Sequence, residues 1–179
     1  MRPLVSICCM TYNHEKYIAD AIESFLMQKT DFAYEIIIHD DASTDNTAKI
    51  IREYEMKYPE IIKPIYQKEN QYSKKVNIEY NFIGPKVRGK YVATCEGDDY
   101  WTDPEKLQKQ VNFLEKHEDF ILCFHAVAIV DTSGKLTGRY LGLKGKGSKE
   151  LTIRDTVKGG QMHISSRLIR AEYYKSKKP

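Results

Sequence analysis

The chain has 179 residues, of which 41% are hydrophobic and 30% charged, an ordinary composition for one globular domain. No run approaches the ~18 apolar residues of a membrane helix and no secretory signal is visible, so we expect a cytoplasmic protein. The net charge of +3 is uneven, because residues 135–179 hold twelve Lys/Arg against three Asp/Glu; this basic segment is either simply solvated or a peripheral contact with the inner face of a membrane.

Strand and helix patterns alternate from the start of the chain. A buried strand is predicted over residues 4–10, and a helix over 14–28 follows it. A second strand spans 34–39, after which Asp45 caps a helix that Pro59 ends. A third strand is expected over 61–66, followed by a helix over 76–87 that Gly84-Pro85 ends early.

The second half of the chain begins with a fourth strand over 90–95 and a helix that Asp103-Pro104 starts. Residues 120–130 are predicted as a long fifth strand, turned at 131–134, and residues 135–150 as a mobile loop. Residues 162–170 form a last strand-like run. This alternation indicates an α/β fold with a mostly parallel sheet, which binds ligands at the carboxyl ends of its strands.

The four cysteines give no sign of a metal or disulfide site. They lie inside apolar runs that are predicted as strands, and none forms a CxxC pair or a cluster with histidine: Cys8, Cys9, Cys95 and Cys123. We therefore expect buried, reduced thiols, as is usual for a cytosolic protein.

Three polar segments follow predicted strands directly. The first runs from Thr11 through Tyr12 and Asn13 to Glu15, in place of the glycine-rich turn of a dinucleotide-binding fold. Its hydroxyl, aromatic ring and amide could bind a nucleotide base, although Thr11 or Asn13 could equally cap the next helix. The second segment, Asp40-Asp41, offers carboxylates to a uracil ring or a ribose, and on its own is equally consistent with a solvated loop.

The third segment, Glu96-Gly97-Asp98-Asp99, carries the strongest signal. Three carboxylates within four residues repel one another unless a cation is present. Oxygen ligands favour Mg²⁺ or Mn²⁺, and such an ion would bridge the phosphates of a nucleoside diphosphate. The alternative is an acidic turn that binds no metal. It is less favoured because all three segments are expected at one edge of the sheet.

At this point the sequence resembles a known family. The segments VSICCMTYNHEKYI, DDASTDNT and GKYVATCEGDDYWTDPEKLQKQ are similar to those of inverting family 2 glycosyltransferases over roughly residues 3–130. The resemblance implies a GT-A fold, a Rossmann-like, mostly parallel central sheet flanked by helices. It also implies a nucleotide-sugar-binding core over 1–130, with 131–179 as the start of an acceptor-side region.

The resemblance assigns roles to individual residues. It places five residues against the nucleotide of a UDP-sugar, with Asp41 on the base: Thr11, Tyr12, Asn13, Glu15 and Asp41. Glu96 and Asp98 occupy the DxD-type position, and Asp99, with Asp98, would bind Mn²⁺ or Mg²⁺. The implied acceptor is a carbohydrate or a lipid-linked glycan, and no nucleic-acid partner is expected.

An inverting transfer also needs a general base. In this family it is an acidic residue that follows a segment like MHISSRLIR, so we expect it beyond Pro179 and expect residues 1–179 to bind UDP and metal but to transfer sugar poorly. A non-catalytic donor-binding domain therefore stays open. A nucleotidyltransferase is the other alternative, and it would need a glycine-rich phosphate loop after the first strand.

Several further residues carry weaker signals. Lys74 and Lys75 are candidates for a phosphate contact, and Tyr100 and Trp101 for the wall of the pocket or for the core. His163 is a candidate on the acceptor side. His39 and His125 fall inside predicted strands and are expected to be packed there.

Overall fold

The computed structural model describes residues 2–142, 147–156 and 162–176. Its centre is a six-stranded sheet of order β3-β2-β1-β4-β8-β5. Four strands are parallel: β1 (Val5–Thr11), β2 (Tyr34–Asp40), β3 (Ile62–Tyr66) and β4 (Tyr91–Glu96). The short β8 (Leu168–Arg170) runs antiparallel between β4 and β5 (Leu122–Cys123). The expected α/β fold with a mostly parallel sheet is confirmed.

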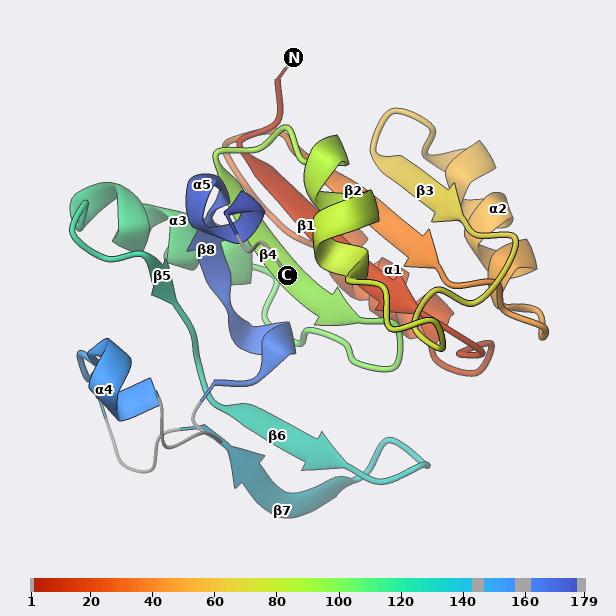
Figure 1. Ribbon diagram of the computed structural model, residues 1–179. Coiled ribbons are helices and arrows are strands. Elements are labelled where there is room, and N and C mark those ends of the chain that lie inside the picture. Colours follow the sequence, from red (N-terminus) through yellow and green to blue (C-terminus); the bar gives the residue numbers. More distant parts are fainter. Residues whose placement is uncertain (1, 143–146, 157–161, 177–179) are drawn as a thin grey trace.

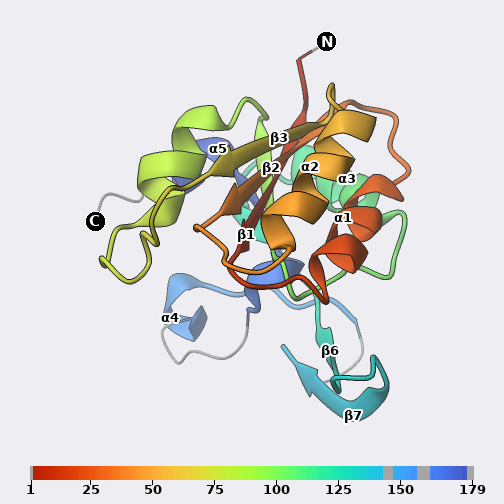
Figure 2. The ribbon, with the colours of Figure 1, turned by 90° about the vertical axis from the view of Figure 1, so that its right-hand side faces the viewer.

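Helices cover both faces of this sheet (Figures 1 and 2). Three α-helices lie on one face: α1 (Ile18–Leu26), α2 (Thr47–Lys57) and α3 (Lys106–Lys116). The other face is covered by the π-helix η1 (Glu79–Ile83), the 3-10 turn η2 (Gly84–Lys86) and α5 (Ala171–Lys175). A short helix, α4 (Ile153–Thr156), lies apart from the sheet. Within the described residues, no helix has the length and apolar character needed to cross a membrane.

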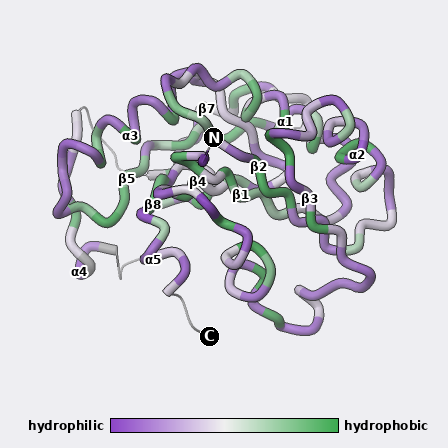
Figure 3. The backbone as a smooth tube through the Cα atoms, turned by 90° about the horizontal axis from the view of Figure 1, so that it is seen from above, coloured by the Kyte–Doolittle hydropathy of each residue, from purple (hydrophilic) through white to green (hydrophobic). Residues whose placement is uncertain are grey.

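The core follows from strands that are apolar on both faces, and Figure 3 shows these hydrophobic strands inside a hydrophilic periphery. Alternate residues of β1 point to opposite sides, so Ile7 packs with the α1–α3 layer while Cys8 packs with Ile83 and Tyr174. Cys8, Cys9 and Cys95 are buried and Cys123 is half-buried, and all four are free thiols, as predicted. Burial raises the pKa of each thiol, which keeps it protonated.

The predicted strands of the first 100 residues are confirmed to within one residue, and the helices begin later than predicted. Asp45 lies two residues before α2, and its carboxylate accepts from Thr47 N, in the first residue of that helix, at 2.9 Å. Asp103 accepts from Glu105 N at 2.9 Å, although α3 itself begins at Lys106. The helix expected over 76–87 is instead a π-turn followed by a 3-10 turn, because Pro85 has no N–H with which to continue an α-helix.

The prediction of one long strand over 120–130 is wrong. Strand β5 ends at Cys123, and a separate hairpin forms from β6 (Val127–Val130) and β7 (Leu136–Leu141). The reason lies in its neighbour: β8 offers partners only to Leu122 and Cys123, because the chain just before it is the 3-10 turn η3 (Ile164–Ser166). The strand-like run predicted over 162–170 is therefore correct only for its last three residues.

The hairpin also corrects the prediction of a loop over 135–150. The turn expected at 131–134 is present, and Asp131 N donates to Lys135 O at 2.9 Å across it. Beyond it, β7 is a strand because β6 supplies its backbone partners, although every residue of β7 is exposed. An exposed strand containing Gly138 lacks the apolar alternation that would reveal it in the sequence. Residues 143–146 of the predicted loop lie outside the described residues.

One charged side chain lies in the core of the α3 face. Lys106 is only 4% exposed, its Nζ lies 4.0 Å from the centre of the Trp101 ring, and it donates to Gln110 Oε1 at 2.8 Å. Burial lowers the pKa of this amine to about 7, because the low-dielectric interior disfavours its charge. The buried cation therefore costs stability below that pH and costs less above it.

Replacing this lysine should remove part of the pH dependence of stability. Because the folded pKa of Lys106 lies below the unfolded one, its penalty is full below pH 7 and is relieved as the pH rises. Between pH 6 and pH 8.5 we expect the unfolding free energy of the native chain to rise by roughly 1–3 kcal/mol more than that of Lys106→Met. Urea unfolding at both pH values measures it, with the exposed Lys116→Met as control. Equal pH profiles for the native chain and Lys106→Met would contradict the buried charge.

Candidate functional site

The polar segments that follow β1, β2 and β4 meet at one edge of the sheet. In the strand register Thr11 lies beside Asp40 and Met10 lies beside Glu96. Past the strand ends, Asp41 N donates to Thr11 O at 3.0 Å and Gly97 N donates to Met10 O at 2.9 Å. The sheet order reverses at β1, with β2 on one side and β4 on the other, which is where such sheets bind ligands.

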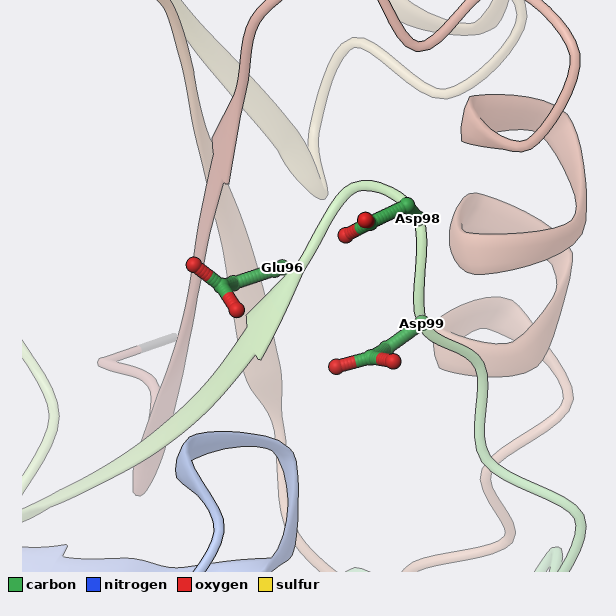
Figure 4. A group of neighbouring side chains, drawn as sticks. All are labelled: Glu96, Asp98 and Asp99. Atoms are coloured by element: carbon green, nitrogen blue, oxygen red, sulfur yellow. The ribbon is translucent and has the colours of Figure 1, made fainter. Parts of the chain in front are cut away.

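The acidic segment after β4 forms a compact cluster. Glu96, Asp98 and Asp99 each place one carboxylate oxygen within 4.8 Å of the others, and Figure 4 shows the side chains of Asp98 and Asp99 extending toward the side on which Glu96 lies. Burial, and then the charges of Asp98 and Asp99, raise the pKa of Glu96. Three oxygen donors at this spacing fit a divalent ion such as Mg²⁺ or Mn²⁺.

The protein itself offers little positive charge to balance the three carboxylates of this cluster. Among the described residues no lysine or arginine pairs with these carboxylates, and the nearest basic groups are two histidines. His14 Nε2 lies 3.9 Å from Asp98 Oδ2, and His163 Nδ1 lies 3.8 Å from Asp99 Oδ2. Because no lysine or arginine of the described residues pairs with it, the cluster of three carboxylates favours a bound cation.

Gly97 allows the acidic turn to lie directly against the end of β1. A Cβ atom at this position would lie 2.6 Å from Thr11 Oγ1 and 3.0 Å from His14 Nδ1, closer than van der Waals contact permits. Within the described part of the chain, Thr11 Oγ1 and His14 Nδ1 are buried without a hydrogen-bond partner. Buried polar atoms of this kind are normally satisfied by water or a ligand.

The segment after β1 is locked to the segment after β2. Asn13 has a left-handed backbone, with φ of 55°, and its Oδ1 accepts from Thr44 N at 2.8 Å. Glu15 Oε2 accepts from Asn46 N at 3.0 Å, while Glu15 N donates to Asp45 Oδ2 at 3.1 Å. These bonds give Asn13 and Glu15 structural roles, and their predicted contact with a nucleotide stays a prediction. Tyr12 is 42% exposed at the same edge, where it could stack on a base.

Asp41 holds the loop that follows β3. Its carboxylate is buried and accepts from Gln71 N at 2.8 Å and from Tyr72 N at 2.9 Å. Asn70 Nδ2 also donates to Asp41 O at 3.2 Å. The loop over 67–75 is therefore drawn to the edge where the nucleotide was predicted. The base contact predicted for Asp41 stays a prediction, since a carboxylate with two donors keeps further lone pairs.

Sequence reasoning missed a partner of the acidic cluster. The hydroxyl of Ser165, in η3, donates to Asp99 Oδ2, and the ring of His163 lies beside it. The sequence offered no signal for Ser165 beyond its hydroxyl, because it lies 66 residues from Asp99. His163, a candidate on the acceptor side, thus lies beside the acidic cluster.

The structure places the lysine and aromatic candidates in different surroundings. Lys74 is ion-paired with Glu69 at 2.6 Å, and Lys75 is exposed on the same loop with a φ of 59°. Trp101 is core, 4% exposed and 4.9 Å from the Phe25 ring, whereas Tyr100 is 41% exposed.

The prediction of packed histidines holds only in part. His39 is fully buried, and its Nε2 lies 3.1 Å from Gln67 Nε2. Burial lowers the pKa of His39, which favours a neutral ring. The prediction is wrong for His125, which is exposed because the chain leaves the sheet after Cys123.

Comparison with known proteins gives one consistent family. Residues 6–175 match the model of glycosyl transferase family 2. An uncharacterized protein of Mycobacterium tuberculosis is 45% identical over 132 residues, which cover 73% of this chain and 37% of that protein. The putative glycosyltransferase EpsE of Bacillus subtilis is 37% identical over 139 residues, covering 78% of this chain and 48% of EpsE. The chain thus spans less than half the length of either relative.

Solved structures support the fold. S. aureus TarS 1–349, in complex with UDP-GlcNAc, aligns with 96% of this chain and 46% of its own at a TM-score of 0.61 and 21% identity. The mannosyltransferase PcManGT from Pyrobaculum calidifontis, in complex with GDP-Man and Mn²⁺, aligns with 96% and 46% at a TM-score of 0.62 and 18% identity. The expected GT-A fold is confirmed.

Adding one methyl group at Gly97 should disrupt the site. In Gly97→Ala the new Cβ would overlap Thr11, so we expect a loss of about 1–3 kcal/mol in unfolding free energy, typical of overpacking. The measurement is urea unfolding of Gly97→Ala, Thr11→Gly and the double variant. If the overlap causes the loss, the double variant is more stable than the sum of the single effects. Strict additivity would show that the two residues do not collide.

Neutralising Glu96 should change stability and metal binding in opposite directions. With EDTA present at pH 7.5, Glu96→Gln removes a repelled charge and should stabilise the protein by less than about 1 kcal/mol, because the group is half exposed. That gain should vanish as the pH falls, since Glu96 takes up its proton at a higher pH than an ordinary glutamate. Added MnCl₂ should raise the melting temperature of the native chain more than that of the variant. A less stable variant in EDTA would argue against the repulsion.

Proposed function

The chain belongs to glycosyl transferase family 2, and we propose that it transfers a sugar from a UDP-sugar donor to an acceptor hydroxyl with inversion at the anomeric carbon. The acceptor is proposed to be a carbohydrate or a lipid-linked glycan, within polysaccharide or glycan biosynthesis. We propose residues 1–130 as the nucleotide-sugar-binding core and residues 131–179 as the start of the acceptor side. The single observation that carries the proposal is the meeting of three polar segments beyond β1, β2 and β4.

The similar proteins support this choice of substrate class. EpsE of B. subtilis is named a putative glycosyltransferase, and its 37% identity extends over 78% of this chain. TarS is described with UDP-GlcNAc, and PcManGT with GDP-Man and Mn²⁺. Between the two nucleotides we choose uridine, because the resemblance of the segment around Asp41 implies recognition of uracil.

The end of β2 would recognise the nucleotide base. Asp41 would accept from the uracil N3–H through lone pairs that Gln71 and Tyr72 leave free. Tyr12 would offer an exposed ring to the base, and the buried Thr11 hydroxyl would gain the partner it lacks within the described residues. Asn13 and Glu15 would act here mainly by holding this wall of the pocket in place.

The end of β4 would bind the diphosphate end of the donor. Glu96, Asp98 and Asp99 would hold Mn²⁺ or Mg²⁺, with Asp99 and Asp98 as the direct ligands. When bound, the ion would supply positive charge against the diphosphate leaving group. Gly97 keeps this turn close to Thr11, so that base and diphosphate sites share one short edge.

The basic segment over 135–179 is proposed to face the acceptor. Its twelve Lys/Arg and three Asp/Glu suit a phosphate-bearing, lipid-linked acceptor. From the same charge we propose a peripheral contact with the inner, cytoplasmic face of a membrane.

Calorimetric titration tests the proposal directly. We expect UDP to bind with MnCl₂ present, and EDTA or Asp98→Asn to weaken binding at least about 10-fold, because metal and diphosphate bind together. UDP should bind more tightly than GDP. Asp119→Asn, an exposed carboxylate on another surface, is the matched control and should change nothing.

Two results would count against the proposal. If UDP does not bind in the presence of Mn²⁺, the proposed donor site is wrong. If EDTA does not change the affinity for UDP, the proposed metal requirement is wrong. A donor-hydrolysis assay on the same protein then distinguishes an enzyme from a non-catalytic donor-binding domain, which would bind UDP-sugars and leave them intact.

A further inference from the structure

The turn η3 is held unusually firmly beside the acidic cluster. Its three successive backbone carbonyls each accept a hydrogen bond from a buried side chain, and the three donors come from β4, from the loop after it and from α3. The bonds are Thr94 Oγ1 to Ile164 O at 2.6 Å, Trp101 Nε1 to Ser165 O at 2.8 Å, and Gln110 Nε2 to Ser166 O at 2.9 Å. Such a turn has little freedom to shift relative to the sheet.

The donors are themselves fixed by charged neighbours. Arg167 Nε donates to Thr94 Oγ1 at 2.8 Å, so that hydroxyl must direct its own proton to the carbonyl in η3. Lys106 Nζ donates to Gln110 Oε1 at 2.8 Å, which leaves the amide nitrogen of Gln110 for Ser166 O. The buried lysine therefore orients an amide that anchors the turn.

The anchored turn presents one hydroxyl to the acidic cluster. Ser165 is 4% exposed, its N–H donates to His163 Nδ1 at 3.3 Å, and its Oγ donates to Asp99 Oδ2. This bond holds Asp99 close to Glu96 and Asp98 against the repulsion among the three carboxylates. The hydrogen bond occupies one lone pair of Asp99 and leaves Oδ1 and the remaining lone pairs for a cation.

We propose that Ser165 is a positioning residue for the metal-binding carboxylate Asp99, with η3 and its three anchors as the rigid support. The inference rests on the proposed function, because it takes Asp99 to bind a divalent ion. Hydrogen-bond partners of metal-binding side chains fix the orientation of those side chains, and their loss typically weakens metal binding 10- to 100-fold. Without the Ser165 hydroxyl, Asp99 would rotate away from its two negative neighbours.

The test is the affinity for Mn²⁺, measured by the loss of the free-ion EPR signal in the presence of UDP. Ser165→Ala should raise the dissociation constant for Mn²⁺ about 10- to 100-fold and change the EPR spectrum of the bound ion. Ser166→Ala is the matched control: it removes a hydroxyl from the same turn, one that donates to His163 O at 2.7 Å and touches no carboxylate. It should alter the affinity less than about threefold.

Each outcome decides the inference. Equal affinity for Ser165→Ala and the native chain overturns the role of Ser165 and leaves the proposed function intact. Equal loss in both serine variants also overturns it, because the turn as a whole would then matter and not the bond to Asp99. A native chain that binds no Mn²⁺ overturns the inference and the proposed metal site together. Ser165→Cys, which keeps a similar volume with a weaker donor, provides the same test should the alanine variant be unstable.

Discussion

The parallel pairing of β1 with both β2 and β4 is the constraint on which the rest of this structure depends. It fixes the register in which Thr11 meets Asp40 and Met10 meets Glu96, so three loops leave the sheet at one edge. Backbone bonds continue this pairing one residue past the strands, from Asp41 N to Thr11 O and from Gly97 N to Met10 O. A shift of register by one residue would exchange the residues that face the two helix layers, such as Ile7 and Cys8, so core packing and site geometry are determined together.

The edge is crowded with negative charge that folding alone does not balance. Glu96 has a raised pKa, and among the described residues the basic groups paired with the cluster are the partly exposed His14 and His163. Holding one oxygen of each of three carboxylates within 4.8 Å of the others costs free energy, and a divalent cation would recover that cost. The fold tolerates the arrangement because the sheet, with its strands buried on both faces, supplies the remaining stability.

Residues after 130 complete this site from a distance in sequence. Strand β8 enters the central sheet antiparallel to β4, and this brings η3 to the acidic turn. The same short strand limits β5 to two paired residues, so the chain leaves the sheet after Cys123 and forms the β6–β7 hairpin. One feature, the turn before β8, thus supports Asp99 and redirects the chain toward the region proposed for the acceptor.

The sequence by itself determined the parallel core and the position of the acidic and polar segments, because long apolar runs and turn residues act locally. Asp41 and the Glu96–Asp99 segment could be assigned to one edge from the alternation of elements alone. The break after Cys123, the exposed strand β7 and the bond from Ser165 to Asp99 were decided only by the tertiary structure. Their cause is pairing between segments far apart in the chain, which leaves no periodic signal in the residues that take part.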